Sequence, residues 1–87
     1  MREGEPVPTL FILDVPEFAP LVQALGAEAG IRKRKHGAYW AFDGDGHIAL
    51  ERRSARVGEA IWFGALTGGF EGRVAEFSPE RLRIIAE

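Results

Sequence analysis

The stretch IRKRKHGAYWAFDGDGHIALERR, residues 31–53, decides the fold that the sequence predicts. At its centre lies DGDG, residues 43–46, and glycine and aspartate are the residue types that tight turns between strands favour. The segments on both sides of this turn read as strands. We therefore predict a β-hairpin in which residues 31–42 pair with residues 47–53.

The register of this hairpin follows from its apolar side chains. A three-residue loop pairs Phe42 with Ile48 and Trp40 with Leu50, which places four large apolar side chains on one face. A two-residue loop would put Ile48 and Leu50 on the face opposite to Trp40 and Phe42. Because a slip by one residue moves every side chain to the other face, the first register is the predicted one.

One strand and one helix are predicted before the hairpin. Residues 7–15 are dense in large apolar side chains and are bounded by prolines, which indicates a strand. Apolar residues then recur at helical spacing over residues 18–29, and Gly30 is a natural helix stop. Asp14 and Glu17 resemble a capping box at the start of this helix.

One helix and two strands are predicted after the hairpin. Ser54 is a suitable N-cap for a second helix over residues 55–67, which two glycines close. Residues 72–77 and 82–86 then form a short terminal hairpin. The predicted order is β-α-β-β-α-β-β, an α+β two-layer sandwich with two helices on one face of a largely antiparallel sheet.

Length and composition set limits on this protein. With 87 residues we expect a single domain over residues 7–87, preceded by a flexible arm at residues 1–6. The chain has no cysteine, which excludes disulfides and thiolate metal sites. The longest uncharged run, residues 60–70, is far shorter than the roughly 20 residues of a membrane span. We expect a cytoplasmic protein that does not enter the membrane.

The second helix is too apolar for a peripheral helix. Its apolar residues leave almost no polar face, and a helix that is apolar all round is buried all round. A two-layer domain covers only one side of such a helix, so a second copy, a partner protein or an apolar ligand is expected on the other. The alternative is that a loop or the N-terminal arm folds over the helix. Aromatic residues dominate interface energetics. The predicted contact residues are Trp62, Phe63, Tyr39 and Trp40.

Positive charge is concentrated in one part of the chain. Residues 31–56 hold seven lysines and arginines against three acids, although the whole chain has a formal net charge of −2. The predicted hairpin gathers these cations at one end, which would suit an anion or RNA. A charged edge strand that resists aggregation explains the same run. The candidate anion-binding residues are Arg32, Arg34, Arg52, Arg53 and Arg56, with Lys33 and Lys35 beside them.

Catalytic and metal chemistry have little support in the sequence. The predicted register sets Tyr39 opposite Glu51, with His47 nearby, which is the one conceivable acid–base site. His36 lies seven residues from the turn that holds His47, roughly 23 Å along the strand, so the two histidines do not share a metal site. No metal or cofactor is predicted, and we do not expect an enzyme.

The predicted function is a small non-catalytic binding or accessory module. It would act as an oligomer or as a subunit beside a larger protein. One alternative is an anion- or RNA-binding module that uses the basic segment, residues 31–56. The neutral overall charge weakens this alternative. The other alternative is a small enzyme with Tyr39, Glu51 and His47 as its acid–base site.

Overall fold

The computed structural model describes residues 7–87, so the arm predicted for residues 1–6 lies outside the described residues. The strands are β1 (Thr9–Leu13), β2 (Ile31–His36), β3 (Tyr39–Gly44), β4 (His47–Glu51), β5 (Phe70–Glu71), β6 (Arg73–Phe77) and β7 (Arg81–Ile85). The helices are η1, a 3-10 helix (Pro16–Phe18), α1 (Ala19–Ala27), α2 (Arg52–Ala55) and α3 (Glu59–Phe63). This composition confirms the predicted α+β class.

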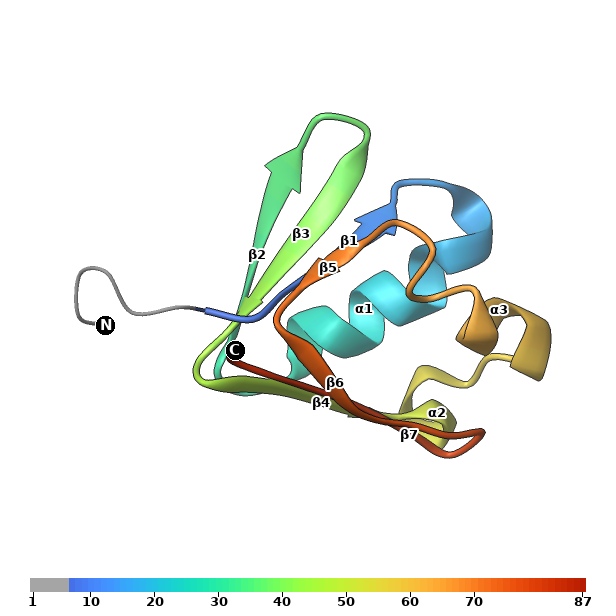
Figure 1. Cartoon of the computed structure of the whole chain (residues 1–87). Coiled ribbons are helices and arrows are strands. Elements are labelled where there is room, and N and C mark those ends of the chain that lie inside the picture. Colours follow the sequence, from blue (N-terminus) through green and yellow to red (C-terminus); the bar gives the residue numbers. More distant parts are fainter. Residues whose placement is uncertain (1–6) are drawn as a thin grey trace.

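The strands form two antiparallel sheets. One has the order β2-β3-β1-β5 and the other the order β4-β7-β6. Figure 1 shows that the sheets diverge and that α1 lies in the angle between them. From α1, the side chains of Leu21 and Leu25 are completely buried in the common core. The apolar face of each sheet is therefore covered by the other sheet and by α1.

Two glycines lie where the chain passes from one sheet to the other. Gly44 ends β3, and a Cβ atom there would collide with the backbone oxygen of His47. Gly72 links β5 to β6 with a φ of +121°, and a Cβ atom there would lie 2.6 Å from the backbone oxygen of Ile85. Both positions need glycine because the backbones approach so closely.

The predicted hairpin between residues 31–42 and 47–53 is wrong. The turn lies at Gly37, so that β2 pairs with β3, whereas β4 pairs with β7 in the other sheet. The reason is competition for β3, because β2 takes one of its edges and the apolar strand β1 takes the other. Phe42 consequently lies opposite Leu10, not opposite Ile48.

The inward and outward alternation of the side chains was predicted correctly. Phe42, Ile48 and Leu50 are buried in one core cluster, and Trp40 is partly buried against it. These four side chains thus share a core without pairing across one hairpin. Their burial depends on the period of two in a strand, which does not depend on the pairing partner.

The predicted bounds of the helix over residues 55–67 are wrong. Two short helices form instead: α2 ends at Ala55, where the predicted helix begins, and α3 occupies only residues 59–63. Arg56 closes α2 in a left-handed conformation with φ 58° and ψ 44°, and Gly58 is the N-cap of α3. Ser54 lies inside α2 and makes no cap. The capping box predicted for Asp14 and Glu17 does not form either, because Val15 is the N-cap of η1 and has no side-chain cap hydrogen bond.

The predicted terminal hairpin is confirmed as the pair β6 and β7. Its turn is held by Ser78, whose Oγ accepts hydrogen bonds from the backbone N–H groups of Glu80 at 3.3 Å and Arg81 at 3.1 Å. A serine hydroxyl that caps its own turn in this way is common between strands. The turn also reaches α3, as described next.

Candidate functional site

Trp62 is a core residue of α3. Its side chain is 0% exposed, and its ring lies against Phe77 with 6.0 Å between the ring centroids. The indole Nε1 donates a hydrogen bond of 2.7 Å to the carbonyl oxygen of Ser78. This bond satisfies the only polar atom of the buried side chain and ties α3 to the β6–β7 turn. Trp62 was predicted as a contact residue, but the fold encloses it completely.

Phe63, the next residue, lies on the surface. It is 43% exposed, and its ring meets that of Phe77 edge-on at 5.3 Å. Phe70 is 40% exposed, and these two phenylalanines are the exposed large hydrophobic residues of the described chain. Exposed aromatic side chains beside a rigid core are typical of protein contacts. Of the predicted contact residues, Phe63 is the one that α3 presents outward.

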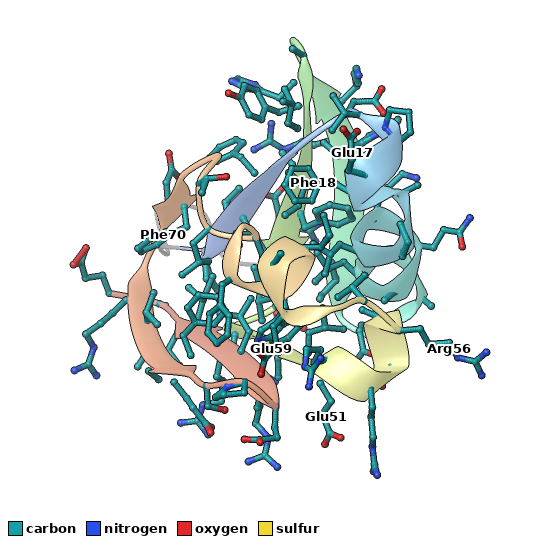
Figure 2. All side chains as sticks on the ribbon, turned by 90° about the vertical axis from the view of Figure 1, so that its right-hand side faces the viewer. Glu17, Phe18, Glu51, Arg56, Glu59 and Phe70 are labelled. Carbon is teal, nitrogen blue, oxygen red and sulfur yellow. The ribbon has the colours of Figure 1, made fainter. Side chains whose placement is uncertain are left out.

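We call the surface formed by Phe18, Phe63 and Phe77 the α3 surface. Figure 2 shows α3 turned toward the viewer, with Phe18 above it on η1. Phe70 lies on β5, which Figure 1 places away from α3, so it is not part of this surface. Phe18 is half-buried, and its ring lies 3.6 Å from the position that a Cβ atom of Gly64 would take. Several elements therefore contribute aromatic side chains to the side of the molecule that carries α3.

Acidic side chains accompany the α3 surface. Glu59 is exposed in the first turn of α3, and Glu17 is exposed in η1, next to Phe18. Figure 2 shows both glutamates on the side of the molecule that carries α3. An apolar centre with charged residues around it has the composition of a protein interface, in which the rim stays polar.

Tyr39 and Trp40 point to opposite faces of the first sheet. Trp40 is partly buried against the core, and the ammonium groups of Lys33 and Lys35 lie 4.4 and 4.8 Å from its ring centroid. Tyr39 is half-buried, and its ring lies 3.1 Å from the position of a Cβ atom at Gly68. The predicted contact residues therefore do not form one continuous surface. Phe63 is the last residue of α3 and Tyr39 contacts the segment that follows it, whereas Trp62 is buried in the core and Trp40 is packed against the core.

The cations of β2 are engaged within their own sheet. Arg34 makes two hydrogen bonds to the carboxylate of Asp43, at 2.7 and 3.2 Å, and the hydroxyl of Thr9 donates to the same carboxylate at 2.7 Å. These bonds, Arg34 first, lower the pKa of Asp43. Lys35 likewise binds Asp14 at 2.7 Å and lowers its pKa. The charged strand is thus largely explained by local pairing.

The candidate anion-binding residues do not gather in one place. Arg32 and Arg34 lie on β2, whereas Arg52, Arg53 and Arg56 lie in and after α2, which follows a strand of the other sheet. Figure 1 shows β2 and α2 at opposite ends of the molecule. The prediction that these charges meet at one end is wrong, because it depended on the hairpin that does not form.

The arginines at α2 line a cleft of about 520 Å³. We call it the arginine cleft, and it is lined by Glu51, Arg52, Arg53, Arg56, Val57, Glu80 and Arg81. Arg52 joins its walls, because Nε donates to the carbonyl of Pro79 at 2.6 Å and Nη1 to the carbonyl of Val57 at 3.2 Å. The sequence predicted three of these arginines as a group but missed Arg81, which only the pairing of β4 with β7 brings close.

The acid–base site predicted from Tyr39, Glu51 and His47 is not assembled. Tyr39 lies opposite Leu13 in the first sheet, whereas Glu51 and His47 lie on β4 in the second sheet. Glu51 instead contacts arginines, with Arg53 Nε at 3.1 Å. Within residues 7–87, no cluster of three or more His, Asp or Glu side chains is placed to hold a metal ion. The described helices include none that is long and apolar enough to cross a membrane.

Sequence reasoning also missed Phe70, which the predicted loop between two elements concealed. The available signal is an aromatic residue directly after two glycines. This residue begins β5, which has only two residues, and a strand of that length leaves no recognisable pattern in the sequence. Such a residue is exposed here because the short edge strand has β1 on one side and no strand on its other side in the described chain.

Comparison with known proteins finds a similar fold among solved structures. The chain matches no protein family, and no curated protein matches it. A chain in the structure of a phenol hydroxylase–regulatory protein complex is similar, with a TM-score of 0.76 and 10% sequence identity. The match covers 93% of this chain and 99% of that chain. The two chains therefore share a fold over almost their whole length.

Proposed function

We propose that this chain is an accessory subunit that docks on a larger protein through the α3 surface. The exposure of Phe63 directly beside the buried Trp62 carries the proposal. The fold it shares with a chain from a hydroxylase–regulatory protein complex supports an enzyme as the larger partner. The cytoplasmic location stays a prediction that belongs to this proposal.

The energetics suit a docking anchor. Complete burial of a phenylalanine side chain contributes about 1.5–3 kcal/mol, so covering the exposed part of Phe63 contributes roughly 1 kcal/mol. Phe63 is held against Phe77, and Trp62 anchors α3 from beneath through Ser78. Little conformational freedom is therefore lost when a partner covers the surface.

A partner of different sequence suits the α3 surface better than a second copy. In a symmetric dimer the same patch faces itself, so Glu17 and Glu59 would meet acidic groups of the other copy. Like charges brought together in an interface are unfavourable. A larger protein with basic groups around an apolar pocket avoids this repulsion.

A photo-crosslinking amino acid at position 63 tests the proposal. Benzoylphenylalanine replaces Phe63 in cells of the native host, and the same group at exposed Gln23 on α1 is the matched control. We expect one larger protein to be cross-linked from position 63 and not from position 23. The purified partner should then bind the chain in solution, and Phe63→Asp should weaken that binding about tenfold or more.

The opposite outcomes are equally clear. Cross-linking only to a second copy of the chain would replace the proposal with a homo-oligomer. Equal labelling from positions 63 and 23, or no labelling from position 63, would remove the α3 surface as the docking site. Unchanged affinity of Phe63→Asp for the purified partner would do the same.

A further inference from the structure

We propose that the arginine cleft binds an acidic segment of the larger partner, with side-chain carboxylates held by Arg53 and Arg56. This inference rests on the proposed function, because it names a second contact of the same docked partner. The cleft lies next to α3 along the chain, because only Val57 and Gly58 separate Arg56 from that helix. One partner can therefore span both surfaces.

The frame of the cleft is built before any ligand arrives. Arg52 holds the carbonyls of Pro79 and Val57 with its side chain, and its backbone N–H donates to the carbonyl of Glu80 at 2.8 Å. The β6–β7 turn and the link between α2 and α3 are thereby fixed relative to each other. A preformed cleft loses little entropy when it binds.

The charge of the cleft favours an anion. Its lining contains four arginines and two glutamates, a net charge of +2. The Arg53 side chain is 88% exposed and contacts Glu51 through Nε at 3.1 Å. Arg81 is more loosely paired, at 3.9 Å from Glu51 and 3.7 Å from Glu76. An arginine fork binds carboxylates by two parallel hydrogen bonds, so these side chains suit Asp and Glu residues.

The backbone of Arg56 is the second observation. Among the described residues it is the only non-glycine residue with a positive φ, and it occupies the position after a helix where glycine is favoured. The side chain is exposed, and Figure 2 shows it extending away from the body of the molecule beside α2. The exposed guanidinium therefore extends the positive surface of the cleft outward.

A peptide fits this site better than a compact anion. The cleft is open, and Val57 adds an apolar surface to its charged lining. A peptide can place successive carboxylates on Arg53 and Arg56 and rest its aliphatic carbons on Val57.

The test is a titration of the 87-residue protein with a hexaglutamate peptide, followed by amide shifts in ¹⁵N–¹H NMR spectra. We expect shifts confined to residues 51–57 and 79–81. Arg56→Gly should weaken binding of the peptide about threefold. The double variant that combines Arg56→Gly with Arg53→Gln should weaken it about tenfold. The same Arg56→Gly change should raise Tm, because it relieves the left-handed backbone. Arg73→Gln removes one exposed cation outside the cleft and is the matched control.

Several results would overturn the assignment. Shifts that map to β2, or an equal loss of affinity in Arg73→Gln, would mean unspecific attraction to positive charge. Equally strong binding of inorganic phosphate at the same sites would make the ligand a small anion. Unchanged peptide affinity in Arg56→Gly with a raised Tm would leave Arg56 without a binding role. If a larger protein is cross-linked from position 63 but the peptide causes no shifts in the cleft, the proposal for the cleft alone is refuted. If the peptide shifts the cleft residues but nothing is cross-linked from position 63, the proposal for the α3 surface alone is refuted.

Discussion

Replacing Trp62 by phenylalanine should destabilise the protein much more than the same change at Trp40. Trp62 is fully buried and donates through Nε1 to the carbonyl of Ser78, whereas Trp40 is partly buried and has the ammonium groups of Lys33 and Lys35 within 4.8 Å of its ring centroid. Trp62→Phe keeps an apolar ring but removes the donor and part of the ring volume. The Ser78 carbonyl then loses this partner.

The magnitude follows from these two losses. The hydrogen bond contributes about 0.5–1.5 kcal/mol net. The space left by the smaller ring adds about 1–1.5 kcal/mol, in the range of other core truncations. Trp62→Phe should therefore lower the free energy of unfolding by about 1.5–3 kcal/mol, and Trp62→Ala by about 4–5 kcal/mol. A chain of 87 residues is stable by about 4–13 kcal/mol, so the alanine variant approaches global unfolding.

Urea unfolding followed by far-ultraviolet circular dichroism is the suitable assay, because fluorescence would change with the mutated tryptophan itself. If the free energy of unfolding falls by about 1 kcal/mol per molar urea, Trp62→Phe should lower the urea concentration at the unfolding midpoint by about 2 M. Trp40→Phe should lower the free energy of unfolding by about 1 kcal/mol or less, because its ring is partly solvated. Equal midpoints for the two variants would refute the reasoning. So would a Trp62→Phe variant of unchanged stability that fails to bind the partner, since Trp62 would then be a contact residue.

Two further predictions concern pH and backbone geometry. The hydrogen bonds from Arg34 lower the pKa of Asp43 below its ordinary 3.8, so this group stabilises the fold above pH 3.8 and loses that effect as the pH falls below it. Urea midpoints at pH 7 and pH 3 should therefore differ less in Asp43→Asn than in the wild type, and an equal difference would contradict this. Gly72→Ala should lower the free energy of unfolding by about 1–3 kcal/mol, because φ is +121° and Cβ would lie 2.6 Å from the oxygen of Ile85. Gly26→Ala, inside α1 with only ordinary contacts, should instead raise it by about 0.5–1 kcal/mol in thermal unfolding, and equal signs for the two glycines would contradict the geometry.

The helical region shows why the candidate site was only partly predictable. The sequence of residues 55–67 indicates an apolar helix, and the count of apolar residues correctly suggests that part of it lies uncovered. It does not tell which of two consecutive aromatic residues faces inward. That choice depends on tertiary contacts, among them the hydrogen bond from the indole N–H of Trp62 to the carbonyl of Ser78, sixteen positions further along. Phe63 lies on the outer side of α3, with its ring edge-on against Phe77.

The basic segment gives a similar lesson about charge. Seven cations within residues 31–56 are evident from the sequence, but their division between two sites is not. Arg34 belongs to a pair with Asp43 across two neighbouring strands, and Arg53 belongs to a cleft with Arg81. Coulomb interactions depend on distance in space, and the distances are set by strand pairing.

The sequence by itself determined the α+β class, the antiparallel terminal hairpin and the inward face of β3 and β4. These properties are local, because side chains alternate with a period of two whatever strand lies alongside. Only the tertiary structure decided that β1 and not β4 lies beside β3, that two sheets form, and that Trp62 is buried while Phe63 is exposed. Those outcomes depend on which of several segments, far apart in the chain, pair with one another. The pairing of lowest free energy is the one that buries the most apolar surface while its polar atoms keep hydrogen-bond partners.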